Sequence, residues 1–288
     1  MDFLTWGRNP WGQTILIRIS WDLLWASAVA GLLFLVGHAL YVRYWPKPKG
    51  EEDEARRRRL SQLAARLPEH VARHTLAARL FHWVMAGSMF VLLFTSFLPI
   101  VGVKFSWVTI HWVAGLVLTV SVVYHIIHAS FWLDFWSIWP VRDDITDASR
   151  RFRRSLGRPA PPPRKHPKYP LENKLYHGII MLTGFGAIGT GLVMISRVRT
   201  PLLARNPYLF TDQTWGLMYV LHGLAGVSLV ALVMVHVYFA VRPEKLWITN
   251  SMIFGWITRR QYLEHHEPSR WRVGGGSTSS ATKPAGQA

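Results

Sequence analysis

Residues 222–236 read HGLAGVSLVALVMVH and lie inside an apolar run from Trp215 to Val241. The same pattern, a histidine, two residues, Ala-Gly, nine residues and a second histidine, recurs in HWVAGLVLTVSVVYH, residues 111–125. In a helix, the two histidines of each stretch project from one face about 21 Å apart along the axis. Histidine within an apolar helix is costly and usually faces a bundle interior. The repeated spacing therefore indicates a functional site at two levels of one helix bundle.

Apolar runs long enough to cross a bilayer dominate the chain. Hydrophobic residues make up 50% of it and charged residues only 17%, and many of the 15 tryptophans stand at the ends of the runs, as interfacial aromatics do. Runs of about 20 apolar residues can span a membrane. The sequence therefore predicts an all-α integral membrane protein, a bundle of five transmembrane helices over Trp21–Tyr44, Leu80–Ile100, Trp107–Trp132, Tyr176–Ile195 and Trp215–Val241.

The first run has an alternative interpretation as an uncleaved signal segment. It starts some twenty residues into the chain, however, and ends in YVRYWPKP with no small-residue cleavage site. We therefore expect it to be a spanning helix.

Basic residues determine the expected orientation. The net charge is +17, but the Lys and Arg residues fall into three blocks, ten within 43–79, ten within 134–174 and seven after Val241, with only six elsewhere. This distribution does not fit a nucleic-acid-binding face. With five spans the three blocks share one side, which the positive-inside rule assigns to the cytoplasm. We expect a multi-pass protein of the bacterial inner membrane, with the N-terminus outside and the C-terminus inside.

The organisation follows from these runs. Residues 1–45 would form an extracytoplasmic segment and an extra helix, 46–73 a basic cytoplasmic loop, 74–272 a four-helix core, and 273–288 a disordered tail. A short surface helix is expected within GEEDEARRRRLSQLAARL, residues 50–67, and a stiff extended connector in PAPPPRKHPKYP, residues 159–170. Cysteine is absent, so an iron–sulfur cluster that exchanged electrons with this chain would belong to another subunit.

Topology assigns a depth to each histidine. The third and fifth helices both enter from outside, so His111 and His222 would lie near the outer face and could share one haem iron. His82, His125 and His236 would lie near the inner face, and spacing alone does not decide whether His82 or His125 is the partner of His236. A glycine one turn after the first histidine of each stretch would let a flat macrocycle approach the backbone.

Four short motifs carry a family resemblance. LFHW, IHWVAG, LHGLAG and VHVYFA, with ITRRQYLEHHEPSRW after the last helix, resemble the membrane cytochrome b (gamma) subunit of respiratory formate dehydrogenase, within a di-haem superfamily shared with hydrogenase cytochromes b. The resemblance covers roughly Arg73 to Trp271. It implies two haems b, with His82 and His236 as axial ligands of the inner haem and His111 and His222 as those of the outer haem.

The resemblance also implies a function. Electrons would pass between the quinone or menaquinone pool and an external iron–sulfur subunit, which serves a molybdenum- or tungsten-type catalytic subunit. The chain would then be an electron-transfer subunit without catalytic action on the substrate, and the direction of flow stays open. Two alternatives remain: the same module serving a hydrogenase or another molybdoenzyme, and a transporter or structural membrane protein without haem.

Other histidines exceed the needs of two haems. A third haem between the first and third helices would use His38 with His125 or His128. The alternative is that these side chains serve as interior hydrogen-bond partners.

Further polar residues are candidates for a quinone site and for propionate contacts. Asn173 and His177, at the start of the fourth helix, could bind quinone carbonyls, or Asn173 could cap the helix. Lys174 is expected to anchor it at the membrane interface. Arg73 and Arg79 could pair with inner haem propionates or mark the cytoplasmic boundary. Arg197, which shares the loop of residues 196–214 with Arg199 and Arg205, could meet an outer propionate or an acidic partner, or lie in solvent.

Overall fold

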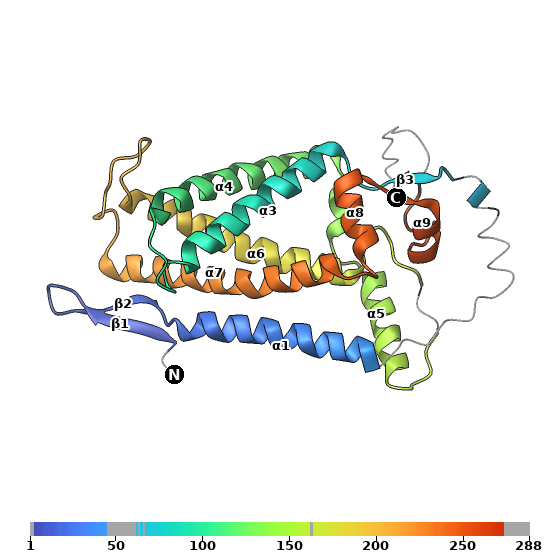
Figure 1. Cartoon of the computed structure of the whole chain (residues 1–288), viewed down its shortest axis with the longest axis horizontal. Coiled ribbons are helices and arrows are strands. Elements are labelled where there is room, and N and C mark those ends of the chain that lie inside the picture. The colour runs from blue at the N-terminus through green and yellow to red at the C-terminus, as the bar shows by residue number, and fades with distance from the viewer. Residues whose placement is uncertain (1–2, 45–61, 63, 66, 162–163, 274–288) are drawn as a thin grey trace, which may run out of the picture.

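Five long helices run side by side in the computed structural model, which describes residues 3–44, 62, 64–65, 67–161 and 164–273 (Figure 1). Each helix is long and apolar enough to cross a membrane. The predicted all-α membrane fold with five spans is thereby confirmed. The tail from residue 274 and most of the helix expected within residues 50–67 lie outside the described residues. The helices are α1 (Asp22–Tyr44), α3 (Leu76–Phe97), α4 (Trp107–Trp132), α6 (Leu171–Met194) and α7 (Asp212–Val241).

Three of these helices begin earlier than their apolar runs. The side chain of Thr75 caps α3 and that of Thr211 caps α7, so the first turn of each contains residues that a hydropathy window leaves out. Helix α6 begins directly after Pro170, which occupies the cap position. Asn173 therefore lies within the first turn, and the interpretation of Asn173 as the helix cap is wrong.

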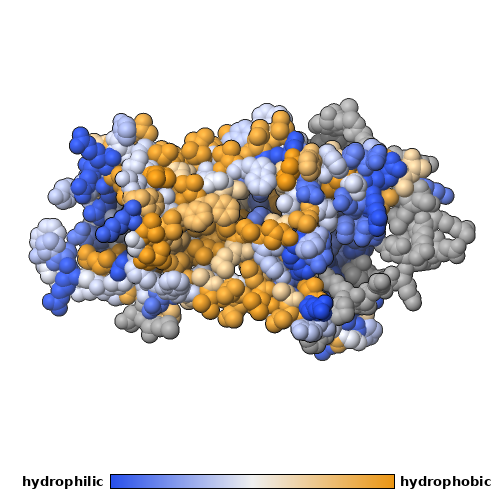
Figure 2. All heavy atoms as spheres, in the orientation of Figure 1, coloured by the Kyte–Doolittle hydropathy of each residue, from blue (hydrophilic) through white to orange (hydrophobic). Residues whose placement is uncertain are grey.

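The helices pack in two pairs, α3 with α4 and α6 with α7, while α3 meets α7 and α4 meets α6 more sparsely. Space-filling Figure 2 shows an apolar band across the middle of the face in view, with more polar residues toward both ends. Few side chains in the spans are fully buried, as expected where lipid covers the outward faces. The extra helix α1 packs along α7 and lies on the opposite side of the bundle from α4 (Figure 1).

An antiparallel hairpin precedes α1, formed by β1 (Leu4–Arg8) and β2 (Thr14–Ile19). No strand is predicted there from the sequence. Strand β2 packs along the start of α7, and a Cβ at Gly216 would overlap the carbonyl of Leu16. Only glycine allows this approach, so the hairpin is fixed to the same helix that carries His222. We call this end of the bundle the hairpin end.

The opposite end is closed by a small folded cap. It comprises β3 (His70–Ala72) paired with β4 (Trp256–Thr258), the helices α5 (Arg142–Ser155), α8 (Leu246–Phe254) and α9 (Arg259–His265), and residues 164–170. Val71, Ile257 and Tyr262 form its core. We call this end of the bundle the cap end.

Short turns follow two of the long helices: η1 (Phe135–Ile138) follows α4, and η2 (Ile195–Arg197) follows α6.

A buried ionic network ties the cap to the bundle. Lys174 Nζ lies 2.7 Å from Asp144 Oδ2, and both residues are almost fully buried. Arg270 bonds to Asp144 at 3.2 Å and to Asp147 at 2.9 Å. The expectation that Lys174 anchors α6 in the membrane interface is wrong, because its ammonium group faces carboxylates of α5 instead of lipid head groups.

Within the cap, the proline-rich connector contacts α9 and the residue that follows it. His166 forms an isolated parallel bridge with His266, and Lys165 Nζ donates to the carbonyl of Leu263. The extended conformation expected for this segment is thus held by tertiary hydrogen bonds over residues 164–170.

Candidate functional site

His111 of α4 and His222 of α7 face each other near the hairpin end. Their ring centroids lie 6.1 Å apart, with an angle of 74° between the ring planes. The sequence predicts these two side chains at one depth, and the structure brings them together.

Hydrogen bonds select one tautomer for His111. Thr95 Oγ1 donates to the carbonyl of Val91 at 2.7 Å, so its oxygen can accept from His111 Nδ1, which lies 2.9 Å away. A proton on Nδ1 leaves the lone pair on Nε2. The threonine therefore holds the ring with Nε2 free to bind a metal.

His222 is held in the same way by α6. Its Nδ1 lies 3.1 Å from the carbonyl of Ala187 and 2.9 Å from Thr190 Oγ1. A carbonyl only accepts, so Nδ1 carries the proton here too. A Cβ at Gly191 would come within 3.2 Å of His222 Cε1, which shows that α6 passes close to the ring. Sequence analysis missed Thr95 and Thr190, because threonines within apolar helices give no distinctive signal.

The second facing pair lies nearer the cap end. The rings of His82 of α3 and His236 of α7 have centroids 6.3 Å apart and planes inclined by 48°. Tyr176 stacks on His236 at 5.4 Å, and its hydroxyl donates to the carbonyl of Leu232. Spacing alone leaves His82 and His125 as possible partners of His236, and the structure places His82 against it.

The spacing in both pairs fits two imidazoles on one metal. An imidazole nitrogen binds a metal at about 2 Å, so the centres of two rings on opposite sides lie about 6 Å apart. Among the described residues, no group of three or more His, Cys, Asp or Glu side chains could hold a metal ion. The donor set therefore suits an iron whose other four ligands come from a macrocycle, as in haem with two axial histidines.

The two helix pairs leave space between them. Helices α3 and α7, and helices α4 and α6, are in sparse contact, whereas each histidine pair joins a side chain of one helix pair to a side chain of the other.

The remaining candidate histidines have other neighbours. His38 Nδ1 lies 3.1 Å from the hydroxyl of Tyr238 and 3.0 Å from Arg242. His128 stacks between Tyr124 and Trp132. Because α1 and α4 lie on opposite sides of the bundle (Figure 1), the structure does not bring His38 together with His125 or His128.

His125 lies beside the pair at the cap end without joining it. Its ring stacks on Phe81 at 4.0 Å, nearly parallel. Its buried Nδ1 has no hydrogen-bond partner among the described residues. His177 of α6 is close enough to interact with it electrostatically, and Asn173 lies one turn earlier on α6.

The candidate propionate ligands already have contacts within the protein. Arg73 is buried in the cap, where it contacts His266 Nε2 at 3.1 Å and donates to the carbonyl of Lys168. Burial lowers the pKa of Arg73 to about 10. Arg79 donates to the carbonyl of Ile253, and Arg197 lies 5.0 Å above the ring of Trp215. Their contact with haem propionates stays a prediction.

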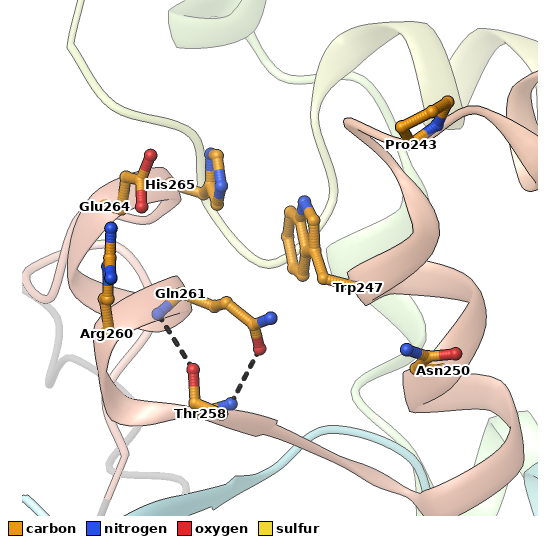
Figure 3. A pocket seen from close by; sticks show the side chains of 8 residues that line it. All are labelled: Pro243, Trp247, Asn250, Thr258, Arg260, Gln261, Glu264 and His265. Atoms are coloured by element: carbon orange, nitrogen blue, oxygen red, sulfur yellow. Dashed lines mark hydrogen bonds between the residues drawn. The ribbon is translucent and has the colours of Figure 1, made fainter.

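A cavity of about 410 Å³ lies away from both histidine pairs, between α8 and α9 (Figure 3). Its wall includes Trp247, whose ring stacks on that of His265, and Gln261, which is engaged in a capping box with Thr258. None of the four paired histidines lines it. The cavity belongs to the cap and is not the cofactor site.

Comparison with known proteins places this geometry in a family. A family model described as prokaryotic cytochrome b561 matches residues 73–255, the part of the chain that carries both histidine pairs. No curated protein matches the chain. The matched part covers more than half of the 288 residues. The chain therefore belongs to the prokaryotic cytochrome b561 family, and it is a multi-pass membrane protein of the type that binds b-type haem and transfers electrons.

Proposed function

We propose that this protein holds two haems b and passes electrons between a redox partner at the hairpin end and the quinone pool at the cap end. The main support is that two facing histidine pairs lie at different depths of one bundle and share α7. His111 and His222 would ligate one iron, and His82 and His236 the other.

The residues around each pair would fix the ligands. A haem bound by two histidines supplies a one-electron carrier with no open coordination position. Thr95, Thr190 and the carbonyl of Ala187 hold the Nδ1 protons of the hairpin-end pair, so that each Nε2 presents its lone pair. Tyr176 packs on His236 and limits rotation of its ring. The apolar helix faces exclude water from both pairs.

Quinone would bind beside the pair at the cap end, near His177 and Asn173 of α6. His125 supports this location, because its ring stacks on Phe81 and its buried Nδ1 has no hydrogen-bond partner among the described residues. Imidazole and amide groups can donate to the two carbonyl oxygens of a quinone head group. Electrons would move to or from the quinone through the neighbouring pair, with proton exchange on the same side.

The partner would be an iron–sulfur subunit attached to a formate dehydrogenase-like catalytic subunit on the extracytoplasmic side. This assignment is supported by the motifs LFHW, IHWVAG, LHGLAG and VHVYFA and by the absence of cysteine from this chain. Isolation of the native complex and identification of its metal-containing subunits tests it. A hydrogenase or another molybdoenzyme in the complex would replace the formate assignment while leaving haem binding intact.

Haem quantitation on histidine variants tests the ligand assignment. We expect the His222→Ala protein and the His236→Ala protein each to lose one haem per chain. The two proteins should lose different components of the reduced-minus-oxidised b-type spectrum. The matched controls His125→Ala and His128→Ala should keep both haems. An unchanged haem content in both ligand variants would rule out the proposal.

Quinol reduction tests the second site. In a His177→Gln protein with both haems present, we expect the rate of haem reduction by a short-chain quinol to fall about tenfold, since one hydrogen-bonding group is lost or misplaced. His128→Gln, at a position where the ring stacks between Tyr124 and Trp132 of α4 itself, should react like the wild type. Equal rates in both variants would exclude the location.

A further inference from the structure

The hairpin end carries structure that the family match does not cover. The hairpin β1–β2 and helix α1 precede residue 73, where the match begins. They nevertheless pack on α7 beside the first histidine pair: Ile19 lies against Gly223, next to His222, and Asn9 donates to Asp212. The hairpin is therefore a rigid addition to the surface around the His111–His222 pair.

Large side chains on this surface face outward. Trp11 at the hairpin tip is 75% exposed, Tyr208 in the loop of residues 196–211 is 88% exposed, and Leu202 in the same loop is 72% exposed. Figure 1 shows the hairpin and this loop at the same end of the bundle, on either side of the start of α7. Exposed aromatic and apolar groups of this kind characterise binding surfaces.

The same end is positively charged. The six Lys and Arg residues outside the three cytoplasmic blocks all belong to it, and in the described part of the chain only Asp22 and Asp212 oppose them. Among the described residues, none of the six is in a salt bridge. Five are exposed: Arg8, Arg18, Lys104, Arg199 and Arg205. Such an excess of positive charge is contrary to the positive-inside rule. We therefore expect a negatively charged partner to bind this surface.

We infer that the hairpin and the loop of residues 196–211 together form the docking surface for an acidic electron-transfer domain. The inference rests on the proposed function. Arg8, Arg199 and Arg205 attract the acidic surface, and Trp11 and Tyr208 provide apolar contacts. His111 and His222 would hold the haem that accepts one electron from a reduced cluster of the docked partner, and that cluster would be oxidised by the transfer. Reverse flow uses the same contact.

Stopped-flow kinetics with a defined donor tests the electrostatic part. The probe is a reduced, acidic plant-type [2Fe–2S] ferredoxin, mixed with the haem-loaded full chain in lipid nanodiscs. We expect Arg199→Glu/Arg205→Glu to lower the second-order rate about tenfold or more at low ionic strength and to flatten its salt dependence. The control Arg153→Glu/Arg158→Glu makes the same charge change on exposed residues at the cap end and should stay within twofold of wild type. Equal effects of the two variants, or none, would overturn the inference.

A second measurement does not depend on haem. Because the chain has no cysteine, Trp11→Cys and Tyr208→Cys proteins each take a single nitroxide label. We expect both labels to be accessible to a water-soluble nickel relaxant and to lose mobility when ferredoxin is added. Labels that contact lipid-soluble oxygen instead, and ignore ferredoxin, would assign these aromatics to the bilayer and reject a docking role. Loss of haem without loss of this binding would instead count against the proposed function alone.

Discussion

Lys174 Nζ lies 2.7 Å from Asp144 Oδ2, and this ion pair joins α6 to α5. Both side chains are almost fully buried. Burial would raise the pKa of Asp144, but the hydrogen bonds from Lys174 and the Val141 backbone and the charges of Lys174 and Arg270 together outweigh it, and the pKa lies below its ordinary value. The carboxyl group of Asp144 is therefore charged at neutral pH. The cap is attached to the spanning helices by charges that have no access to water.

Removing one partner should be costly. We expect Lys174→Met to reduce the free energy of unfolding by about 3 kcal/mol, because the carboxylate of Asp144 is left buried and short of a partner. Denaturant unfolding followed by tryptophan fluorescence measures this. The control Lys104→Met, at an exposed position, should change stability by less than about 0.5 kcal/mol. Equal stability of the two variants would show that the pair does not hold the cap.

Thr190 should affect the haem affinity of one histidine pair only. In Thr190→Val, His222 Nδ1 keeps the carbonyl of Ala187 but loses a hydroxyl at 2.9 Å. We expect haem affinity at the His111–His222 site to fall about tenfold, measured by haem retention in detergent, with the other site unchanged. Thr183→Val is the matched control, since its hydroxyl bonds only the carbonyl of Ile179 on the same helix. A loss at both sites would indicate general unfolding of α6.

Gly216 and Gly37 should respond in opposite directions to alanine. A Cβ at Gly216 would overlap the carbonyl of Leu16, whereas one at Gly37 of α1 would meet nothing within 4 Å. We expect Gly216→Ala to destabilise by about 1–3 kcal/mol by displacing the hairpin, and Gly37→Ala to be neutral or stabilising. Protease susceptibility of the hairpin distinguishes local detachment from global unfolding. A stable hairpin in Gly216→Ala would contradict the tight contact.

The cap should weaken in mild acid. Burial lowers the pKa values of His166 and His266 to about 4, against about 6.5 in an unfolded chain. Above pH 6.5 neither state binds these protons, so the stability is fully present. As the pH falls from 6.5 to 4, only the unfolded chain takes them up and stability declines. Hydrogen exchange of α9 across this range measures the loss.

A single substitution identifies the source of that pH dependence. His166→Gln keeps a side-chain acceptor for Arg151 but removes the titrating group, so the decline should become shallower. His70→Gln, at an exposed position of β3, should leave the profile unchanged. A profile identical to wild type in both variants would assign the acid sensitivity to other groups.

Periodicity and composition predict much of this molecule because a membrane imposes simple rules. Apolar length identifies all five spans, and the fourteen-residue interval places one member of each facing pair on α7. The choice of His82 over His125 could not follow from spacing, since both lie at the same depth. It depends on which face α3 and α4 turn toward α7, and only tertiary packing decides that.

The parts that sequence analysis missed are small and polar. The hairpin has short strands with a register shift between Thr5 and Trp6, so it lacks a clear alternating pattern. The position of Lys174 looks like that of an interface residue until α5 brings Asp144 to it. Thr95 and Thr190 are recognised only through the rings they face. In each case a contact between residues distant in sequence determines the role.

Helix α7 contributes one imidazole to each facing pair. The distance between the two sites along the bundle is therefore set by the number of residues between two positions of one helix. The loops and the other helices can change length without altering it. One extra residue inserted between Gly226 and Val235 would turn His236 by about 100° relative to His222. An insertion or deletion of one residue in this interval would therefore separate the histidines of one pair, whereas a substitution leaves the length of the interval unchanged.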